Sequence, residues 1–130
     1  MTVTIIVPVY GVEKYIRECA VSLFSQTYDK IEYVFCDDCT PDRSIEILHE
    51  VMAEYPERQV RIIKNEQNKG IGGTRARLIQ EVKSDCFLFV DSDDILPENA
   101  VETLVKRMKE TGTDIVEGGY AEYCNGNICN

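Results

Sequence analysis

Short apolar runs alternate with longer amphipathic stretches along most of the chain. The runs are rich in β-branched and aromatic residues, which is typical of strands buried on both faces of a sheet. They predict five strands, with Pro8 ending the first. These strands are Val3–Val7, Ile31–Cys36, Val60–Ile63, Cys86–Val90 and one that starts at Asp114–Val116.

Between these runs, apolar residues recur at spacings of three and four, which predicts one buried face on each of four helices. The faces are Ile16, Cys19, Ala20, Leu23 and Phe24; Ile45, Leu48, Val51, Met52 and Tyr55; Leu78, Ile79 and Val82; and Val101, Leu104, Val105 and Met108. Thr40-Pro41 and Pro97 predict helix starts, because threonine caps helices and proline suits the first turn. Gly112 predicts the end of the last helix.

The alternation of strands and helices predicts an α/β fold with a mainly parallel sheet. Ligands of such sheets bind outside the carboxyl ends of the strands, at the point where the strand order reverses. Pro8-Val9-Tyr10, Asp37-Asp38 and Asp91-Ser92-Asp93-Asp94 each follow a predicted strand. We therefore expect these three groups to meet at one edge of the sheet.

Composition narrows the class of protein. The 130 residues suit a single domain, and the net charge of −9 argues against a nucleic-acid binder, which needs a basic surface. No apolar run reaches the length of a membrane span, and the first ten residues lack the pattern of a signal peptide. Cys36-x-x-Cys39 has zinc-like spacing, but it lacks a second pair of ligands.

Asp91-Ser92-Asp93-Asp94 is the strongest local signal for chemistry. Three carboxylates within four residues repel one another, and a divalent cation such as Mg²⁺ or Mn²⁺ relieves that repulsion. The alternative is that Asp94 caps a helix and that the other acids are solvated. Both interpretations remain open from these four residues alone.

Two further segments fit a nucleotide site. A carboxylate of Asp37-Asp38 can accept hydrogen bonds from a base or a ribose, although capping of the following helix is the more common role for such acids taken alone. A loop is predicted from Asn65 to Gly73. The glycine-rich segment from Asn68 to Arg75 spans the end of this loop and opens a helix whose N-terminus favours anions, although it matches neither of the common phosphate-loop patterns and a plain turn is the alternative. Tyr10 could stack on a base, and Glu13 lies in a first helical turn.

Taken together and in order, these pieces resemble the family 2 glycosyltransferases, which have the GT-A fold and use nucleotide-diphospho-sugars. The resemblance runs from Val3 to about Gly118. The matching pieces are Ile5-Ile6-Val7-Pro8-Val9-Tyr10, Glu13, Tyr15-Ile16, Ser22-Leu23, Gln26-Thr27-Tyr28, Asp37-Asp38, Asp42, Ser44, Asn68-x-Gly70, Arg75, Phe89-Val90-Asp91-Ser92-Asp93-Asp94 and Pro97.

The resemblance implies a role for each site residue. Those expected to bind the nucleotide-sugar are Pro8, Val9, Tyr10, Glu13, Asp37, Asp38, Gly70, Arg75, Asp91 and Ser92. Asp91-Ser92-Asp93 resembles the DxD motif, with Asp93 as the direct ligand of Mn²⁺ or Mg²⁺ and Asp91 nearer the ribose but also assigned to the metal. The chain departs from the family at Gly11, where asparagine is usual, and at Cys39-Thr40, where Gly-Ser is usual. It also departs at Thr74-Arg75-Ala76, where Ala-Arg-Asn is usual.

The resemblance further implies a division of the chain. Residues 1–118 form the donor-binding half, and residues 119–130 begin an incomplete acceptor-side segment. The expected function is a donor domain that binds a nucleotide-sugar, by default a UDP-sugar, for inverting transfer to the hydroxyl of a glycan, lipid-linked or other acceptor. The expected process is synthesis of cell-envelope polysaccharide or another glycan. The general base is unassigned, because neither Glu117 nor Glu122 matches the expected motif.

Two alternative functions are compatible with parts of the sequence. One is a catalytically silent nucleotide-binding module of the same fold. The other is a receiver-like signalling domain, which needs an acidic pair after the first strand, where this chain has Pro8-Val9-Tyr10. The resemblance implies a cytoplasmic protein without a transmembrane segment or a nucleic-acid partner. In the full-length protein, the alternative location is the inner face of the membrane.

Overall fold

The computed structural model of the chain describes residues 1–119, 122–124 and 127–129. Its main sheet has four parallel strands in the order β3-β2-β1-β4. Their bounds are β1 Val3–Val9, β2 Ile31–Asp37, β3 Gln59–Lys64 and β4 Cys86–Phe89. A separate antiparallel hairpin consists of β5 Glu122–Cys124 and β6 Asn127–Cys129. The predicted parallel α/β fold is confirmed.

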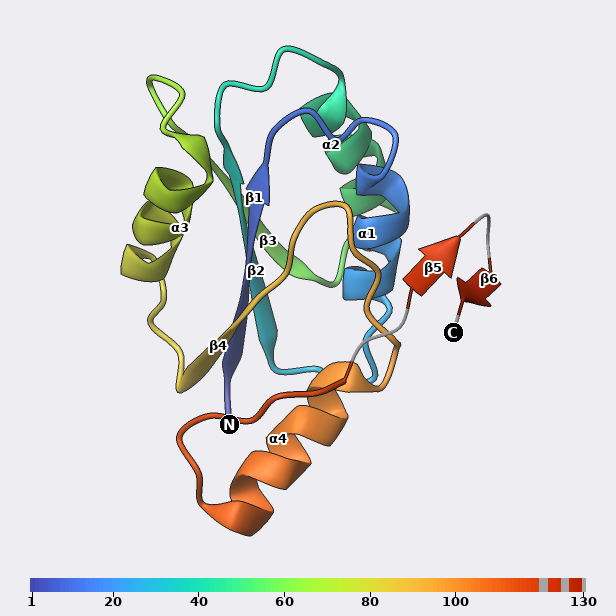
Figure 1. Ribbon diagram of the computed structural model, residues 1–130, viewed down its shortest axis with the longest axis vertical. Coiled ribbons are helices and arrows are strands. Elements are labelled where there is room, and N and C mark those ends of the chain that lie inside the picture. Colours follow the sequence, from blue (N-terminus) through green and yellow to red (C-terminus); the bar gives the residue numbers. More distant parts are fainter. Residues whose placement is uncertain (120–121, 125–126, 130) are drawn as a thin grey trace.

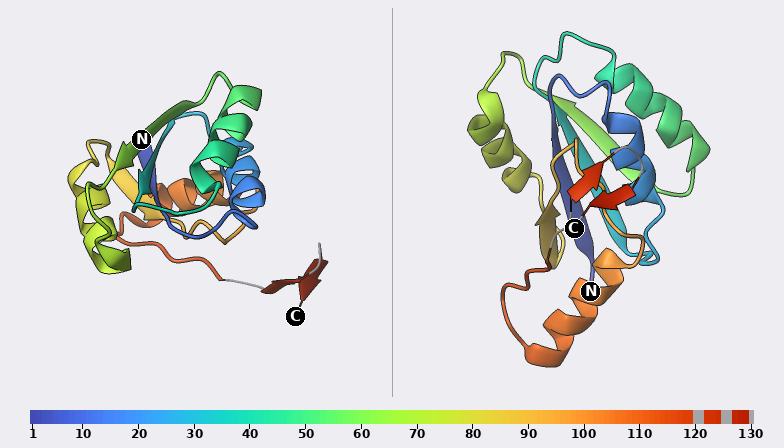
Figure 2. Two further views of the ribbon diagram at one scale, coloured as in Figure 1. Left: turned by 90° about the horizontal axis from the view of Figure 1, so that it is seen from above. Right: turned by 45° about the vertical axis from the view of Figure 1, so that its right-hand side comes forward.

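The helices form a layer on each side of the main sheet. Figures 1 and 2 show α1 and α2 on one face and α3 on the other. The helix bounds are α1 Ile16–Phe24, α2 Ser44–Glu54, α3 Gly70–Gln80 and α4 Ala100–Thr111. The chain goes from β1 to β2 and β3 on one side, and then returns through α3 to place β4 on the other side of β1. The strand order therefore reverses between β1 and β4.

The core is built around β1, in which all seven residues are buried. Ile5 and Val7 pack in the cluster beneath α1 and α2, whereas Ile6 packs with Leu78 of α3. This alternation explains why the strand is continuously apolar. Each fully buried aliphatic side chain contributes about 1.5–3 kcal/mol.

Pro8 lies within β1 and does not end it, so the strand is two residues longer than predicted. The backbone of odd-numbered residues faces β2, as in the bond from Asp38 N to Val9 O. Even-numbered residues face β4, whose pairing with β1 stops at Ile6. The nitrogen of Pro8 therefore points to a side with no strand to receive a hydrogen bond, and the missing N–H costs nothing.

Two helices begin three residues later than their prolines predicted. The second starts at Ser44, and Thr40 instead accepts a hydrogen bond from Gly11 N (2.8 Å) in the preceding loop. The fourth starts at Ala100, after a turn in which Ala100 N donates to Pro97 O. Gly112 ends this helix in the left-handed conformation (φ 66°), as predicted.

Two other predictions were wrong. The glycine-rich segment was expected to be a loop as far as Gly73, but α3 already begins at Gly70. No strand forms at Asp114–Val116, where Ile115 is 84% exposed and has no strand beside it. The apolar character of a three-residue piece does not make a strand without a surface to pack on.

Of the segment 119–130, expected to begin an acceptor-side part, residues 120, 121, 125, 126 and 130 lie outside the described residues. Within the described part of the chain, no helix combines the length and apolar character that crossing a membrane requires.

Candidate functional site

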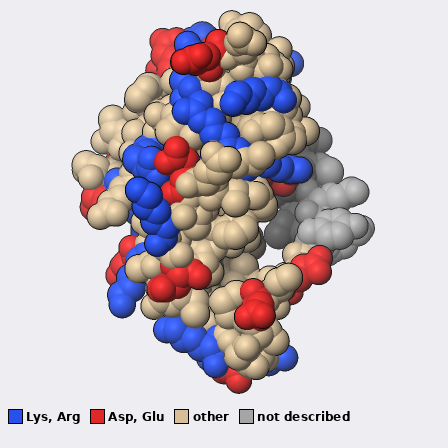
Figure 3. Space-filling view, turned by 90° about the vertical axis from the view of Figure 1, so that its left-hand side faces the viewer, with Lys and Arg blue, Asp and Glu red and all other residues tan. Residues whose placement is uncertain are grey.

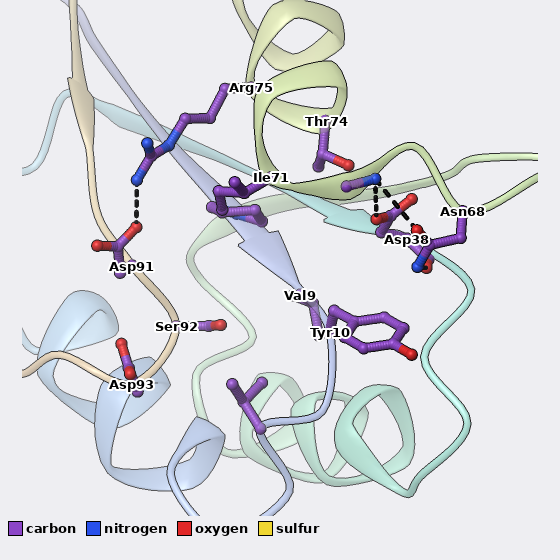
Figure 4. A pocket seen from close by; sticks show the side chains of 13 residues that line it. Val9, Tyr10, Asp38, Asn68, Ile71, Thr74, Arg75, Asp91, Ser92 and Asp93 are labelled. Carbon is purple, nitrogen blue, oxygen red and sulfur yellow. Dashed lines mark hydrogen bonds and ion pairs between the residues drawn. The ribbon is translucent and has the colours of Figure 1, made fainter.

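A cavity of about 510 Å³ lies at the carboxyl ends of β1, β2 and β4 and beside the start of α3 (Figure 4). This is the edge where the strand order reverses, as predicted for a ligand site. Its lining residues are Pro8, Val9, Tyr10 and Val12 from the β1 side; Asp38 after β2; Asn68, Gly70, Ile71, Thr74 and Arg75 around the start of α3; and Asp91, Ser92 and Asp93 after β4.

Asp38 lies at one end of the cavity and is almost completely buried. Its Oδ1 accepts hydrogen bonds from Lys69 N (2.7 Å) and Asn65 Nδ2 (2.9 Å), and its Oδ2 accepts one from Gly70 N (3.0 Å). Burial alone raises the pKa of Asp38, but these donors outweigh burial and hold the pKa below its ordinary value. Asp38 is therefore a charged anchor for the start of α3.

Asn65 links Asp38 to α3 through hydrogen bonds of its side-chain amide. Its side chain is fully buried, and its Nδ2 also bonds Thr74 Oγ1 (3.0 Å). Asn68 Nδ2 bonds the carbonyl oxygen of Asp38 (3.2 Å) at the rim. The sequence prediction missed Asn65 and Thr74, and their signal was weak because each is a lone polar residue in or beside a predicted loop.

The opposite end of the cavity is formed by the acidic segment after β4. Oxygen atoms of Asp91, Asp93 and Asp94 lie within 4.8 Å of one another. Asp94 was considered as a helix cap, but its N–H donates to Asp91 O (3.0 Å) in a turn, and α4 begins only at Ala100. Burial and the charges of Asp93 and Asp91 raise the pKa of Asp94.

Arg75 spans the gap between α3 and this acidic segment. Its Nη2 donates to Asp91 Oδ1 (2.8 Å), and its guanidinium lies 5.7 Å from the centre of the Phe89 ring. Both charged side chains are nearly half exposed, so the pair adds little to stability. Its effect is to orient one carboxylate and to bring a cation to the cavity wall.

The three carboxylates fit a hard divalent cation. They offer oxygen ligands and lie close together, and partial burial with the neighbouring charges of Asp93 and Asp91 raises the pKa of Asp94. Asp93 and Asp91 were the expected ligands. The structure adds Asp94 to the group, and the run of acids in the sequence was the available signal.

Glu13 and Asp37 do not line the cavity, although both were expected to contact the nucleotide. Asp37 Oδ1 accepts a hydrogen bond from Thr40 N (2.9 Å). Glu13 Oε2 accepts one from Arg43 N (3.1 Å), and Glu13 N donates to Asp42 Oδ2 (3.2 Å). Both acids therefore hold loops together.

Asp42 is the centre of this loop junction. Its Oδ1 accepts hydrogen bonds from Ser44 Oγ (2.6 Å), Thr40 Oγ1 (2.7 Å) and Ser44 N (3.1 Å). Burial raises the pKa of Asp42, but the donors prevail and lower it to about 2. The junction fixes the loop after β1, which carries Tyr10, against the loop after β2.

Cys36 and Cys39 are free thiols that both face Asn65. The Sγ of Cys36 lies 3.5 Å from Asn65 Oδ1, and the Sγ of Cys39 lies 3.2 Å from Asn65 O. Cys39 has φ 59°, a conformation that costs a residue with a side chain about 1–2 kcal/mol. The structure thus places Cys39 in a conformation that favours glycine.

A smaller hollow of about 370 Å³ lies outside Asp38 and is lined by Lys64, Lys69 and Arg77 together with three uncharged or acidic neighbours. Figure 3 looks onto the α3 side of the molecule, where several Lys and Arg side chains gather. In a chain of net charge −9, this is a local positive area beside the cavity.

A cavity at the carboxyl ends of the strands, where the strand order reverses, is the usual place for a ligand in a parallel α/β fold. The family is shown by the match of residues 4–127 to the model of "Glycosyl transferase family 2". The chain belongs to this family. Membership excludes the receiver-like signalling domain.

Relatives in bacteria carry glycosyltransferase names. The chain is 35% identical to glycosyltransferase GlyG of Streptococcus pneumoniae over 93% of this chain and 40% of that protein. It is 37% identical to the poly(ribitol-phosphate) beta-glucosyltransferase of Bacillus spizizenii over 91% of this chain and 19% of that protein. The chain thus spans less than half the length of these relatives.

Solved structures resemble the fold over most of the chain. Staphylococcus aureus TarS, solved in complexes with UDP and with UDP-GlcNAc, matches with a TM-score of 0.79 and 29% identity over 88% of this chain and about a third of TarS. A Pyrobaculum calidifontis mannosyltransferase in complex with GDP-Man and Mn²⁺ matches with a TM-score of 0.76 and 21% identity, over 82% of this chain and 32% of that one. The second match supports the GT-A fold alone.

Proposed function

We propose that the chain is the donor-binding part of an inverting glycosyltransferase, and that its cavity binds a nucleotide-diphospho-sugar, by preference a UDP-sugar, with a divalent cation. The observation that carries the proposal is that one cavity has Asp38 at one end and the acidic group at the other. The UDP complexes of TarS support the choice of base.

In this proposal the base lies toward Asp38 and Tyr10. Figure 4 draws these two residues at the same end of the cavity as Asn68. Tyr10 is about half exposed and offers an open ring face for stacking. Because Asp38 is ionised and already bonded to the start of α3, it fixes the backbone against which the base would rest. Asp37 and Glu13 then act through the loops and do not touch the ligand.

The diphosphate lies toward Asp91, Ser92 and Arg75 in the same proposal. Asp93 and Asp91, with Asp94 beside them, are the residues that would hold Mn²⁺ or Mg²⁺. The cation would supply Lewis-acid stabilisation of the charge on the leaving nucleoside diphosphate. The residues of the chain itself hold its carboxylates close together, and Arg75 keeps Asp91 oriented toward the cavity.

The residues that would bind the sugar acceptor are not among those that line the cavity. A general base must take the proton of the acceptor hydroxyl in a single inverting displacement. No acid after Asp94 is assigned to this step. By analogy with the named relatives, we propose that the acceptor is a hydroxyl of a cell-envelope glycan or polymer, and that the protein acts in the cytoplasm or at the inner membrane face.

Calorimetric titration of UDP into the chain, with and without Mn²⁺, tests the proposed donor site. We expect binding that requires Mn²⁺ and that Asp93→Ala lowers at least tenfold, because removal of a ligand carboxylate weakens the metal. Asp29→Ala is the matched control, since Asp29 is an exposed acid that precedes the opposite end of β2. Metal-dependent binding lost in both variants, or no binding of UDP, GDP or ADP with either metal, would contradict the proposal.

The remaining candidate is a catalytically silent nucleotide-binding module of the same family. It predicts the same binding but no transfer, even when the chain is part of a longer protein. Measuring release of UDP from UDP-sugars by a longer form of the protein with candidate acceptors separates the two. Sustained release that depends on acceptor favours the enzyme.

A further inference from the structure

A row of polar side chains on α1 and just beyond it faces the acidic segment that follows β4. The row consists of Cys19, Ser22 and Gln26, spaced at three and four residues so that they share one side of the helix. In Figures 1 and 2 the segment between β4 and α4 runs alongside α1. Ser22 and Gln26 belong to pieces that resemble the family, yet neither lines the cavity.

Gln26 makes the strongest connection in this row. Its side chain is 3% exposed, and its Nε2 donates to Pro97 O (2.7 Å) while its Oε1 accepts from Val101 N (3.0 Å). The N-cap residue of α4, Asn99, makes no side-chain capping bond. Gln26 therefore caps α4 from the loop that follows α1, at a position where an unpaired buried N–H would be costly.

Ser22 and Cys19 hold the same segment closer to the carboxylates. Ser22 Oγ accepts a hydrogen bond from Leu96 N (3.1 Å) and donates to Cys19 O (2.7 Å). The Sγ of Cys19 donates to Asp91 O (3.7 Å). The row thus contacts the backbone at Asp91, at Leu96 and at Pro97.

These contacts involve the backbone of the acidic segment and not its carboxylate side chains. The row binds main-chain atoms only and engages none of the carboxylates of Asp91, Asp93 and Asp94, of which Asp91 is paired with Arg75. A flexible acidic loop would lose conformational entropy each time it bound a cation. A loop whose backbone is already fixed would lose less entropy on binding.

We propose that Ser22 and Gln26 are positioning residues for the metal site, and that the polar row of α1 holds the backbone of the acidic segment so that its carboxylates are arranged before the cation binds. The inference rests on the proposed metal-dependent donor site and adds residues that touch neither metal nor nucleotide. Residues in this position around metal sites affect metal affinity about 10–100-fold.

The test compares the affinity for UDP with and without Mn²⁺ in four variants, alongside the melting temperature of each. Ser22→Ala removes the acceptor for Leu96 N, and Ser22→Thr keeps a hydroxyl. Gln26→Met keeps the length of the side chain but removes its hydrogen bonds. Thr103→Ala is the control, because its hydroxyl bonds Asn99 O (2.8 Å) within α4 and does not reach α1.

We expect Ser22→Ala to weaken the Mn²⁺-dependent affinity about tenfold and Gln26→Met by about 10–100-fold, with metal-free UDP affinity changed less than about twofold. Ser22→Thr should restore most of the loss, and Thr103→Ala should change neither affinity. A fall in melting temperature with an unchanged effect of Mn²⁺ in Ser22→Ala and Gln26→Met would overturn the inference. No effect of Mn²⁺ on the unaltered chain would instead overturn the proposed metal site, on which the inference rests.

Discussion

The two ends of the cavity treat negative charge in opposite ways. At one end, Asp38 is buried and receives hydrogen bonds from Asn65, Lys69 and Gly70, and its pKa is lowered. At the other end, Asp94 stands with two more carboxylates, and its pKa is raised. Both ends are runs of aspartate directly after a strand, so the sequence alone does not distinguish them.

This difference in environment separates a structural carboxylate from carboxylates that are available to a ligand. Asp38 is satisfied by the protein and stabilises the fold whether or not a ligand is bound. The three carboxylates after β4 repel one another, and the protein supplies one cation, Arg75, which pairs with Asp91. Asp38 is thus a structural anchor at the cavity, whereas the acidic group is the proposed site for a divalent cation.

Replacing Asp38 should give the largest effect. Asp38→Ala leaves the N–H groups of Lys69 and Gly70 and the amide of Asn65 without their acceptor. We expect the free energy of unfolding to fall by roughly 3 kcal/mol, measured by urea denaturation. Asp93→Ala, at the other end, should change it by less than about 0.5 kcal/mol. Equal losses in the two variants would contradict the distinction between the ends.

Acid should weaken the loop junction only at low pH, because hydrogen bonds hold the pKa of Asp42 down. The pKa of Asp42 is about 2 in the folded chain against an ordinary 3.8, so its contribution is present above pH 4 and is lost as pH falls toward 2. Asp42→Asn should therefore be less stable than the unaltered chain at pH 7, by about 1–2 kcal/mol, and the gap should close near pH 2. Chemical denaturation at a series of pH values measures the gap, and a gap that widens in acid would be inconsistent with it.

Replacing Asp94 should give the smallest effect on the free energy of unfolding, and it should stabilise the chain. Asp94→Asn removes one charge from the self-repelling group, and we expect it to raise the free energy of unfolding by less than about 1 kcal/mol in the absence of metal, since Asp94 is exposed and water screens its charge. The variant should also show a smaller rise in melting temperature on addition of Mn²⁺. Glu110→Gln, on the exposed side of α4, is the control. Destabilisation by Asp94→Asn without metal would show that the group is satisfied by the protein.

Much of the fold followed from the sequence because buried parallel strands and amphipathic helices have distinct periods. The strands around Val3, Ile31, Val60 and Cys86 and the face of α1 were predicted near their observed bounds. The errors lie at positions where tertiary contacts determine whether a strand forms or continues. Pro8 stays in a strand because no neighbour needs its N–H, and Ile115 forms none because nothing covers it.

The site was predictable to the level of which strand ends meet, and less so for single side chains. Tyr10, Asp38, Arg75 and Asp93 line the cavity, whereas Glu13 and Asp37 accept hydrogen bonds from backbone donors in neighbouring loops, and contact with a nucleotide or a metal stays a prediction for all of them. Which of two adjacent aspartates faces a cavity depends on the loop that follows. Here that loop includes Cys39 in a left-handed conformation, which no pattern of apolar residues reveals.

The position of β4 has a consequence for the order of events as the chain folds. Val3 pairs with Ile31 across one helical connection, but it pairs with Cys86 only after most of the chain has been laid down. Closing the longer loop costs more entropy, so contacts between near neighbours in sequence form more readily. The Asp38 end of the cavity draws on β1, β2 and the start of α3, whereas the acidic end waits for β4 to join β1. Each newly made molecule should thus complete the Asp38 end of the cavity first and its acidic end last.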